Sequence, residues 1–338
     1  MIYPSVSIVI PVYNVEAYIE DCIRSVMRQT YNGPLECIFV DDCGTDNSIL
    51  VVQRVVSKYV GPISFKTIHH TWNRGLSAAR NTGIDAANGN FIFFLDGDDA
   101  LLPESLEILV RPVIEDPTVE MVVGNREKIS AGWQATPETI KLCEIDLNSI
   151  EKVRDYYFSK WLPLSAWNRL IRTDFVRKNR LYFKEGLLYE DQLWIHYVMK
   201  HLNHLYIIPD VTYVYYKHPQ SITTGTCAGE SARHKGIIFE EIAMNLTSGE
   251  EAREAAHIFK EFSSLFFHYP LIPSFQKAAP LFKQALSDGR HYKERFILSS
   301  IIVLSKTILG RWLISAALAL RTLISAHQAP TMTWQRCK

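Results

Sequence analysis

The stretch Phe91-Ile92-Phe93-Phe94-Leu95-Asp96-Gly97-Asp98-Asp99 decides both the fold and the chemistry of this 338-residue chain. Its first five residues form a continuous apolar run, which is typical of a strand buried on both faces of a parallel sheet. Three carboxylates follow that strand directly. Because ligands of such sheets bind at the carboxyl ends of the strands, the stretch predicts a functional site at residues 96–99.

The three carboxylates favour a divalent cation. Three acids within four residues repel one another unless a cation or hydrogen-bond donors neutralise them. Mg²⁺ and Mn²⁺ take carboxylate oxygens and keep positions open for phosphate. Gly97 permits a tight turn and the close approach of a ligand to the backbone. For Asp99 alone, a place near the N-terminus of the helix that begins around Pro103 is an alternative.

The same rhythm of apolar run and helix-period segment occurs throughout the first third of the chain. The expected strands are residues 7–10, 37–40, 65–69 and 91–95, and the expected helices are residues 15–29, 47–59, 76–87 and 103–114. Repeated β-α units predict an α/β fold with a mostly parallel sheet sandwiched by helices. The rhythm breaks near Arg126, although residues 205–216 form a clear strand with a break at Pro209 and Asp210. From Ala228 the chain has helical character.

Composition excludes several classes of protein. The chain is 47% hydrophobic and 21% charged, with 36 basic and 36 acidic residues, so no overall field favours nucleic acid. Six scattered cysteines lack the short spacings of a disulfide framework or a zinc site. The N-terminus enters the first apolar run without a basic segment or a cleavage site. We therefore expect the catalytic part to face the cytosol.

Two more polar groups lie where strands of the predicted sheet end or helices begin. Asp41 and Asp42 close the second strand, where a carboxylate can accept the imide N–H of uracil or ribose hydroxyls. Asp46 and Ser48, just beyond, fit helix capping better. Arg80 lies on the third expected helix. From its spacing alone, the side chain could either contact the nucleotide or be a solvated surface residue.

Glu190 and Asp191 stand among aromatic residues, ahead of an apolar helix. They fit a helix cap. Equally, a carboxylate half-buried against Tyr189 and Trp194 would have a raised pKa and could act as a general base. The sequence alone leaves these two interpretations open.

Taken together, the motifs resemble family-2 glycosyltransferases, inverting enzymes with the GT-A fold. The resemblance covers about residues 4–225, and its motifs occur in the family's order. They are Val9-Ile10-Pro11-Val12-Tyr13-Asn14, Val40-Asp41-Asp42-Cys43-Gly44-Thr45-Asp46-Asn47-Ser48, Asn73-Arg74-Gly75, Ser77-Ala78-Ala79-Arg80-Asn81-Thr82-Gly83, Phe94-Leu95-Asp96-Gly97-Asp98-Asp99, Trp167-Asn168-Arg169-Leu170 and Glu190-Asp191. One departure is Cys43-Gly44, which stands where the family usually has Gly-Ser.

The resemblance implies a role for each motif. Tyr13 would stack on the base, Asp42 would hydrogen-bond uracil, and Asp191 would be the catalytic base. The resemblance implies that the nucleotide and donor are bound by Pro11, Tyr13, Asp41, Asp42, Asn73, Arg80, Asp96 and Gly97. Asp98 would hold the metal, which would be Mn²⁺ or Mg²⁺. The acceptor side would be lined by Trp167, Asn168 and Glu190. Residues 1–125 would then be the nucleotide-sugar half of the GT-A domain, residues 126–225 the acceptor half, and residues 226–338 a helical C-terminal region.

The implied reaction moves a sugar from a nucleotide-sugar, expected to be a UDP-sugar, to a hydroxyl of a glycan or lipid-linked glycan in surface polysaccharide or glycolipid assembly. The metal would neutralise the leaving diphosphate while the acceptor oxygen attacks from the opposite face, which inverts the anomeric configuration. The alternative is a non-catalytic nucleotide-sugar-binding protein on the same fold, against which Asp96, Asp98 and Asp191 argue. A nucleotidyltransferase would need a glycine-rich basic loop, and residues 11–17 have none. The NAD fingerprint is absent as well.

The C-terminal tail suggests a membrane surface. From His257 onward the chain has eleven Lys or Arg and three Asp or Glu, which gives this part a net charge of +8. The preceding residues have a net charge of −8. Residues 296–326 are apolar but interrupted by Lys306, Arg311 and Arg321, so no run reaches the roughly 20 residues of a spanning helix. A basic, apolar helix suits an anionic membrane surface, here the inner face of the membrane. The alternative is a pair of helices packed in the core.

Overall fold

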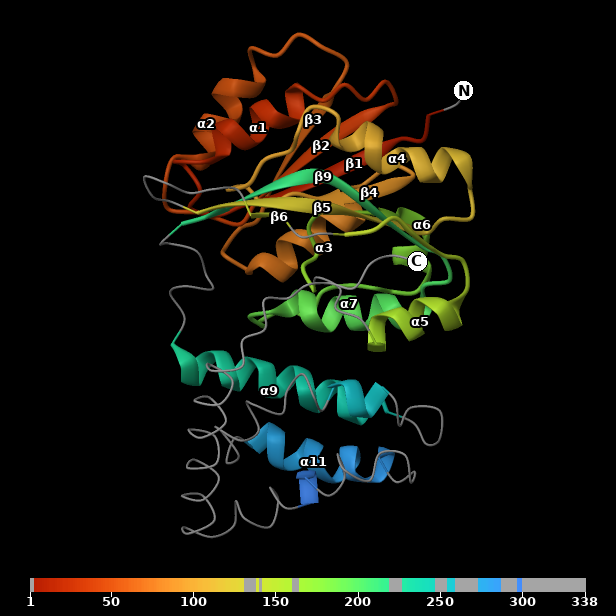
Figure 1. Cartoon of the computed structure of the whole chain (residues 1–338). Helices are drawn as coiled ribbons and strands as arrows, with labels where there is room; N and C mark the ends of the chain where they lie inside the picture. Colours follow the sequence, from red (N-terminus) through yellow and green to blue (C-terminus); the bar gives the residue numbers. More distant parts are fainter. Residues whose placement is uncertain are drawn as a thin grey trace. The chain divides into compact units, whose positions relative to one another are not determined.

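The apolar runs of the first third form one parallel layer of strands in the computed structural model (Figure 1). β1 (Val6–Val12), β2 (Leu35–Asp41), β3 (Ser64–His69) and β4 (Phe91–Phe94) lie in the order β3-β2-β1-β4. Every pair in this layer is parallel. The carboxyl ends of the four strands therefore meet at one edge, where the predicted polar residues follow them.

Helices cover both faces of this layer. Alternate residues of β1, such as Ile8 and Ile10, share one core cluster with α1 (Ile19–Met27), α2 (Ser48–Val56) and α4 (Ser105–Glu115). The opposite face is covered by α3 (Leu76–Ala86) and α7 (Glu190–His201). There the Phe94 ring lies edge-on to Trp194 of α7, with ring centroids 5.8 Å apart. The predicted α/β sandwich is confirmed.

The second half of the sheet is mixed. β8 (Arg169–Arg172) pairs antiparallel with β4 and with β5 (Met121–Ser130), and β5 runs parallel to β9 (Leu205–Lys217). The short strands β6 (Glu138–Thr139) and β7 (Ile145–Leu147) pair with β5 and β9, respectively. β5 and β8 were not predicted. β9 does not break at Pro209 and Asp210, because register shifts in its pairing with β5, between Val123 and Arg126, absorb the irregularity.

Two further helices belong to this half of the sheet. α5 (Ile150–Ser159) follows β7, and α6 (Thr173–Lys178) follows β8. The first turn of α7 carries the Glu190-Asp191 motif.

The structure describes residues 3–130, 138–139, 142–159, 164–218, 227–246, 254–258, 273–286 and 297–299. The chain divides into two compact units, residues 1–157 with 161–225, and residues 158–160 with 226–338. The second unit contains α9 (Ala228–Met244) and α11 (Pro273–Ala285), which pack through stacked Phe239 and Phe282 rings 4.1 Å apart. A helical C-terminal extension is thus present.

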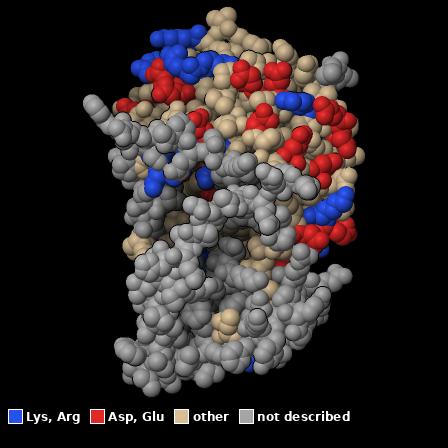
Figure 2. Space-filling model, viewed as in Figure 1, with Lys and Arg blue, Asp and Glu red and all other residues tan. Residues whose placement is uncertain are grey.

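The predicted membrane-surface segment, residues 296–326, lies outside the described residues except for 297–299. Among the described helices, none is long and apolar enough to cross a membrane. On the face drawn in Figure 2, acidic and basic side chains of the described residues lie close together rather than in separate regions of one sign.

Candidate active site

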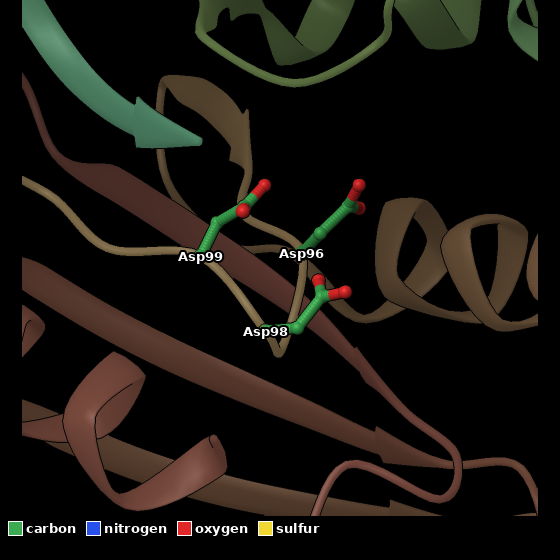
Figure 3. A group of neighbouring side chains, drawn as sticks. All are labelled: Asp96, Asp98 and Asp99. Carbon is green, nitrogen blue, oxygen red and sulfur yellow. The ribbon is translucent and has the colours of Figure 1, made fainter. Parts of the chain in front are cut away.

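The acidic loop after β4 lies at the carboxyl edge of the parallel layer. Figure 3 shows Asp98 at the bend of this loop, with Asp96 and Asp99 on either side. One carboxylate oxygen from each of the three lies within 4.8 Å of the others. Gly97 packs against the end of β1, since a Cβ atom there would lie 3.1 Å from the Pro11 carbonyl oxygen. A side chain at position 97 would therefore push the acidic loop away from β1.

Asp99 is the structural member of the trio. It is 2% exposed, and its two oxygens accept hydrogen bonds from the Tyr213 hydroxyl at 2.7 Å and the Tyr216 backbone N–H at 2.9 Å. Burial, reinforced by the neighbouring carboxylates, raises the pKa of Asp99 well above its usual range. Asp99 thus ties the acidic loop to β9, which leaves Asp96 and Asp98 as the more accessible pair.

The residues at Asp98 fit a divalent cation. The side chains of Asp96 and Asp98 are 25% and 27% exposed. Burial and the repulsion from Asp96 raise the pKa of Asp98, and the adjacent His218 opposes that change. Carboxylates that are costly to ionise side by side gain most from a bound cation. Mg²⁺ and Mn²⁺ bind carboxylate oxygens such as these and can bind a phosphate at the same time.

Asp42 organises the loop after β3. Its side chain is 3% exposed, and each of its two oxygens accepts two hydrogen bonds. One oxygen is 2.6 Å from His70 Nδ1 and 2.9 Å from the Arg74 backbone nitrogen, and the other accepts from Asn73 Nδ2 and from the Gly75 N–H. These four protein donors use the acceptor capacity of the carboxylate. The geometry therefore supports an indirect role for Asp42, in which it holds loop residues 73–75 in position for a nucleotide.

Tyr13 and Asp41 lie on the same edge and are more accessible than Asp42. Tyr13, directly after β1, is 46% exposed, which leaves its ring open to a planar ligand. The Asp41 side chain is 17% exposed, and one of its oxygens lies 2.8 Å from His69 Nδ1. Cys43, where the sequence departs from the family pattern, adopts a left-handed backbone with φ 61°, a conformation in which glycine is more usual.

Arg80 joins the acidic loop to α7. It is 2% exposed and donates to Asp96 Oδ1 at 2.9 Å and to Glu190 Oε1 at 2.6 Å, while its guanidinium lies 5.3 Å from the centre of the Phe183 ring. Burial acts to lower its pKa, but the carboxylates of Asp96 and Glu190 outweigh burial and hold the pKa above its ordinary value. The interpretation of Arg80 as a solvated surface residue is wrong. Arg80 holds two parts of the site together from inside the protein.

Asp191 has the chemistry of a general base. It lies in the first turn of α7, two residues after the N-cap Tyr189, whose backbone is left-handed with φ 64°. Burial, together with the charge of Glu190, raises the pKa of Asp191 to about 7, and Arg80 opposes that change. Glu190 is engaged by Arg80, so the two acids differ in environment. A carboxylate that titrates near neutral pH can take a proton and release it again.

The two predicted acceptor-side residues differ in position. The Trp167 ring is stacked on Tyr213 at 4.5 Å and lies beneath the Arg126 guanidinium. Asn168 is 3% exposed, and its amide donates to the carbonyls of Gly124 and Asn125 and accepts from the Thr212 hydroxyl. This geometry makes Asn168 an internal brace between β5 and β9, and together with Trp167 it lines a small cavity. Its place on the acceptor side stays a prediction.

Three residues around the site were not singled out from the sequence. They are Tyr213, which holds Asp99, His70, which holds Asp42, and His218, whose Nε2 lies 2.7 Å from Asp98 Oδ2. The apolar and aromatic character of β9 is a signal that Tyr213 is buried, and the residue is 0% exposed. The two histidines carry no local signal, since their partners are distant in the sequence.

The comparison with known families agrees with this geometry. The family model described as glycosyl transferase family 2 matches residues 7–185, more than half of the chain. The chain belongs to glycosyltransferase family 2. Its similarity to the uncharacterized glycosyltransferase YibD of Escherichia coli (strain K12) is 28% identity over 221 residues, which is 64% of this chain and 62% of YibD. The chain likewise matches 63% of the length of EpsJ of Bacillus subtilis (strain 168), with 28% identity.

Solved structures of other glycosyltransferases have the same fold. TarS 1-349 of S. aureus in complex with UDP superposes with a TM-score of 0.69 at 20% identity, over 99% of this chain and 94% of TarS 1-349. The mannosyltransferase PcManGT from Pyrobaculum calidifontis, in complex with GDP-Man and Mn²⁺, has a TM-score of 0.54 at 19% identity, over 97% and 88% of the two chains. These likenesses establish the GT-A fold of the family-2 chain.

Proposed function

We propose that this family-2 chain is a metal-dependent, inverting glycosyltransferase that moves a sugar from a UDP-sugar to an acceptor hydroxyl. The observation that carries the proposal is the buried Arg80, which holds Asp96 of the acidic loop and Glu190 beside Asp191 within one arrangement. A donor-binding acid and a candidate base are thereby fixed at the same edge of the sheet. Such fixed geometry is what catalysis by proximity requires.

On the donor side, the exposed ring of Tyr13 would stack on the base, and Asp41 with the loop held by Asp42 would contact the nucleoside. The UDP complex of TarS, on a similar fold, supports uridine as the base. Asp96 would hold ribose or sugar hydroxyls, and Asp98 would hold the cation. When bound, a divalent cation supplies positive charge to the leaving diphosphate. The GDP-Man and Mn²⁺ complex of PcManGT supports a metal of this kind.

On the acceptor side, Asp191 would accept the proton of the attacking hydroxyl. A bond forms between the acceptor oxygen and the anomeric carbon as the bond from that carbon to the diphosphate oxygen breaks, and the electron pair leaves with the nucleoside diphosphate. The proton remains on Asp191 until solvent takes it. Because the attack and the departure occur on opposite faces in a single step, the product has the inverted configuration.

We further propose that the acceptor is a glycan or lipid-linked glycan in surface polysaccharide or glycolipid assembly, with the chain at the cytosolic face of a membrane. The basic, apolar character of residues 296–326 supports this placement. Residues 1–125 and 126–225 would serve the donor and the acceptor, respectively.

The test is turnover with a panel of UDP-, GDP- and dTDP-sugars. We expect a UDP-sugar to raise the melting temperature in the presence of Mn²⁺ and to yield free UDP when an acceptor glycan is added. A donor that stabilises the fold but never yields the nucleoside diphosphate, with any acceptor or with water, would instead indicate the alternative function, a non-catalytic nucleotide-sugar-binding protein.

A further inference from the structure

The segment between α6 and α7 presents alternate side chains to solvent. Leu181 and Phe183 are 4% and 2% exposed, whereas Arg180, Tyr182 and Lys184 are exposed. This alternation is that of an extended chain, in which side chains on one face follow each other at intervals of about 7 Å. The three outward residues, Arg180, Tyr182 and Lys184, therefore form a row about 13 Å long, which we call the basic row.

The backbone beneath the basic row is fixed from two sides. The indole of Trp194, in α7, donates to the Leu181 carbonyl at 2.9 Å. Asn81, in α3, accepts from the Phe183 N–H and donates to the Phe183 carbonyl, both at 2.8 Å. The Phe183 ring also lies beneath the Arg80 guanidinium, which holds the acidic loop and α7 together. Because the row is already rigid, a ligand that binds it loses little affinity to the ordering of the chain.

The basic row runs toward the proposed catalytic base. The Tyr182 hydroxyl donates to Asp85, near the C-terminal end of α3. Two residues later, the Lys184 carbonyl accepts from Ser77 Oγ, in the first turn of α3, at 2.9 Å. The segment is thus antiparallel to α3 and runs to the carboxyl edge of the sheet. From there the chain continues into the first turn of α7, which carries Asp191.

The charge of this surface is positive. Together with Arg74 and Asp85, residues 177–185 contain five basic and two acidic side chains, a net charge of +3. Both acids are already engaged, since Asp85 accepts from the Tyr182 hydroxyl at 2.6 Å and Glu185 is paired with Arg74 at 3.0 Å. The Tyr182 ring, 40% exposed, lies between the two cations of the row. Such a surface suits a ligand that combines apolar ring faces with repeated negative charges.

We propose that the basic row binds an anionic acceptor glycan, whose repeated phosphate or carboxylate groups contact Arg180 and Lys184 while one of its hydroxyls reaches Asp191. The inference rests on the proposed function for the transfer itself and names the chemical class of its acceptor. Two cations about 13 Å apart need a ligand with more than one charged group. The continuity of the row with α7 favours an acceptor chain over a membrane surface. Because the two ion pairs would be exposed, they contribute to affinity and to the position of the acceptor.

The experiment measures the fluorescence anisotropy of labelled polyphosphate and labelled oligogalacturonate mixed with the full chain, with neutral dextran as the uncharged comparison. The first probe carries phosphate and the second carboxylate, so the two distinguish the sources of the negative charge. We expect at least one anionic probe to bind and dextran not to bind. The double variant Arg180→Gln/Lys184→Gln should raise the Kd about tenfold, the usual size for the loss of two exposed ion pairs.

The matched control is Lys58→Gln/Lys66→Gln, which removes two exposed basic residues at and before β3 and should leave the Kd unchanged. If the double variant of the basic row fails to fold, as judged by circular dichroism, Arg180→Gln and Lys184→Gln alone give the same comparison.

Three results would overturn the basic row as an acceptor site and leave the proposed sugar transfer standing. They are equal Kd values for the two double variants, binding of neither anionic probe, and binding of dextran as tight as that of the anionic probes. A double variant that loses binding to phosphatidylglycerol vesicles but keeps its affinity for both anionic probes would assign the row to a membrane surface instead. Turnover of UDP-sugars is measured separately, and its absence with every donor would contradict the proposed function.

Discussion

With Asp191 as the proposed base, we predict that its raised pKa makes the rate of sugar transfer depend on pH near neutrality. Burial and the charge of Glu190 raise the pKa of Asp191 to about 7, against an ordinary value of about 3.9. A general base accepts a proton only when it is ionised, so kcat should rise with pH and level off above about pH 8. At about pH 6, one pH unit below this pKa, about a tenth of Asp191 is ionised, and kcat should be about tenfold below its plateau.

Asp191→Asn tests this assignment because it keeps the shape of the side chain and removes its basicity. With donor, metal and acceptor saturating at about pH 8, we expect kcat to fall by about 10²-fold or more, while donor affinity is unchanged. The residual rate should also lose the pH step near 7. Glu190→Gln is the comparison: it should reduce kcat less and move the pH step lower, because the loss of a neighbouring negative charge lowers the pKa of Asp191.

Stability gives an independent measurement of the same group. A carboxylate whose pKa is higher in the folded than in the unfolded chain destabilises the folded state at high pH, and a tenfold difference in its acid dissociation constant costs about 1.4 kcal/mol. Asp191→Asn should therefore raise the free energy of unfolding at about pH 8, with an upper limit of about 4 kcal/mol. The gain should shrink as the pH falls through about 7 and vanish below about 4.

Three results would refute this reasoning. A larger loss of kcat for Glu190→Gln than for Asp191→Asn would reverse the assignment of the base. Equal, small losses would remove both residues from the chemistry. A kcat that is flat from about pH 5.5 to 8 would contradict the raised pKa.

Three further predictions concern the metal, the tail and the sheet. Asp98→Ala should abolish turnover and keep the fold, as judged by circular dichroism, and undiminished turnover in excess EDTA would contradict a metal requirement. The full chain should float with anionic liposomes at low salt, and flotation should be lost when glutamine replaces Lys306, Arg311 and Arg321; if both proteins stay at the bottom, the helices are core helices. Gly124→Ala should lower the free energy of unfolding by about 1–3 kcal/mol, because the added Cβ overlaps the Thr212 hydroxyl. Gly229→Ala in α9, where nothing lies within 4 Å, should be neutral or stabilising in the same denaturant titration.

The parallel layer was predictable because its signals are local. β1, β2 and β4 are short apolar runs, β3 has a more polar, alternating pattern, and each of the four is followed by a helix-period segment. β8 was missed, since two of its four residues are arginines. Arg169 is 1% exposed, and burial lowers its pKa to about 10, with Asp191 opposing that change. A buried arginine in a strand resembles a surface residue when only the sequence is read.

The candidate site was predictable in its motifs but only partly in its contacts. Asp96, Asp98 and Asp191 are marked by position, at a strand end and a helix start. Arg80 has a buried rather than a surface role because it pairs with Glu190, which lies 110 residues away in the sequence. His218 lies 120 residues from Asp98 and outside every motif. Contacts of this kind are decided by tertiary packing, which leaves no periodic trace in the sequence.

The central claim, inverting sugar transfer, is tested most directly by the configuration of the product. Proton NMR during slow donor hydrolysis, with Mn²⁺ and an α-linked UDP-sugar, distinguishes the anomer that appears first from the one formed by later mutarotation. The account predicts that the β-anomer and UDP appear together, and that Asp191→Asn slows the formation of both by about 10²-fold or more. The α-anomer appearing first, or the absence of nucleoside diphosphate from every donor tested, would contradict it.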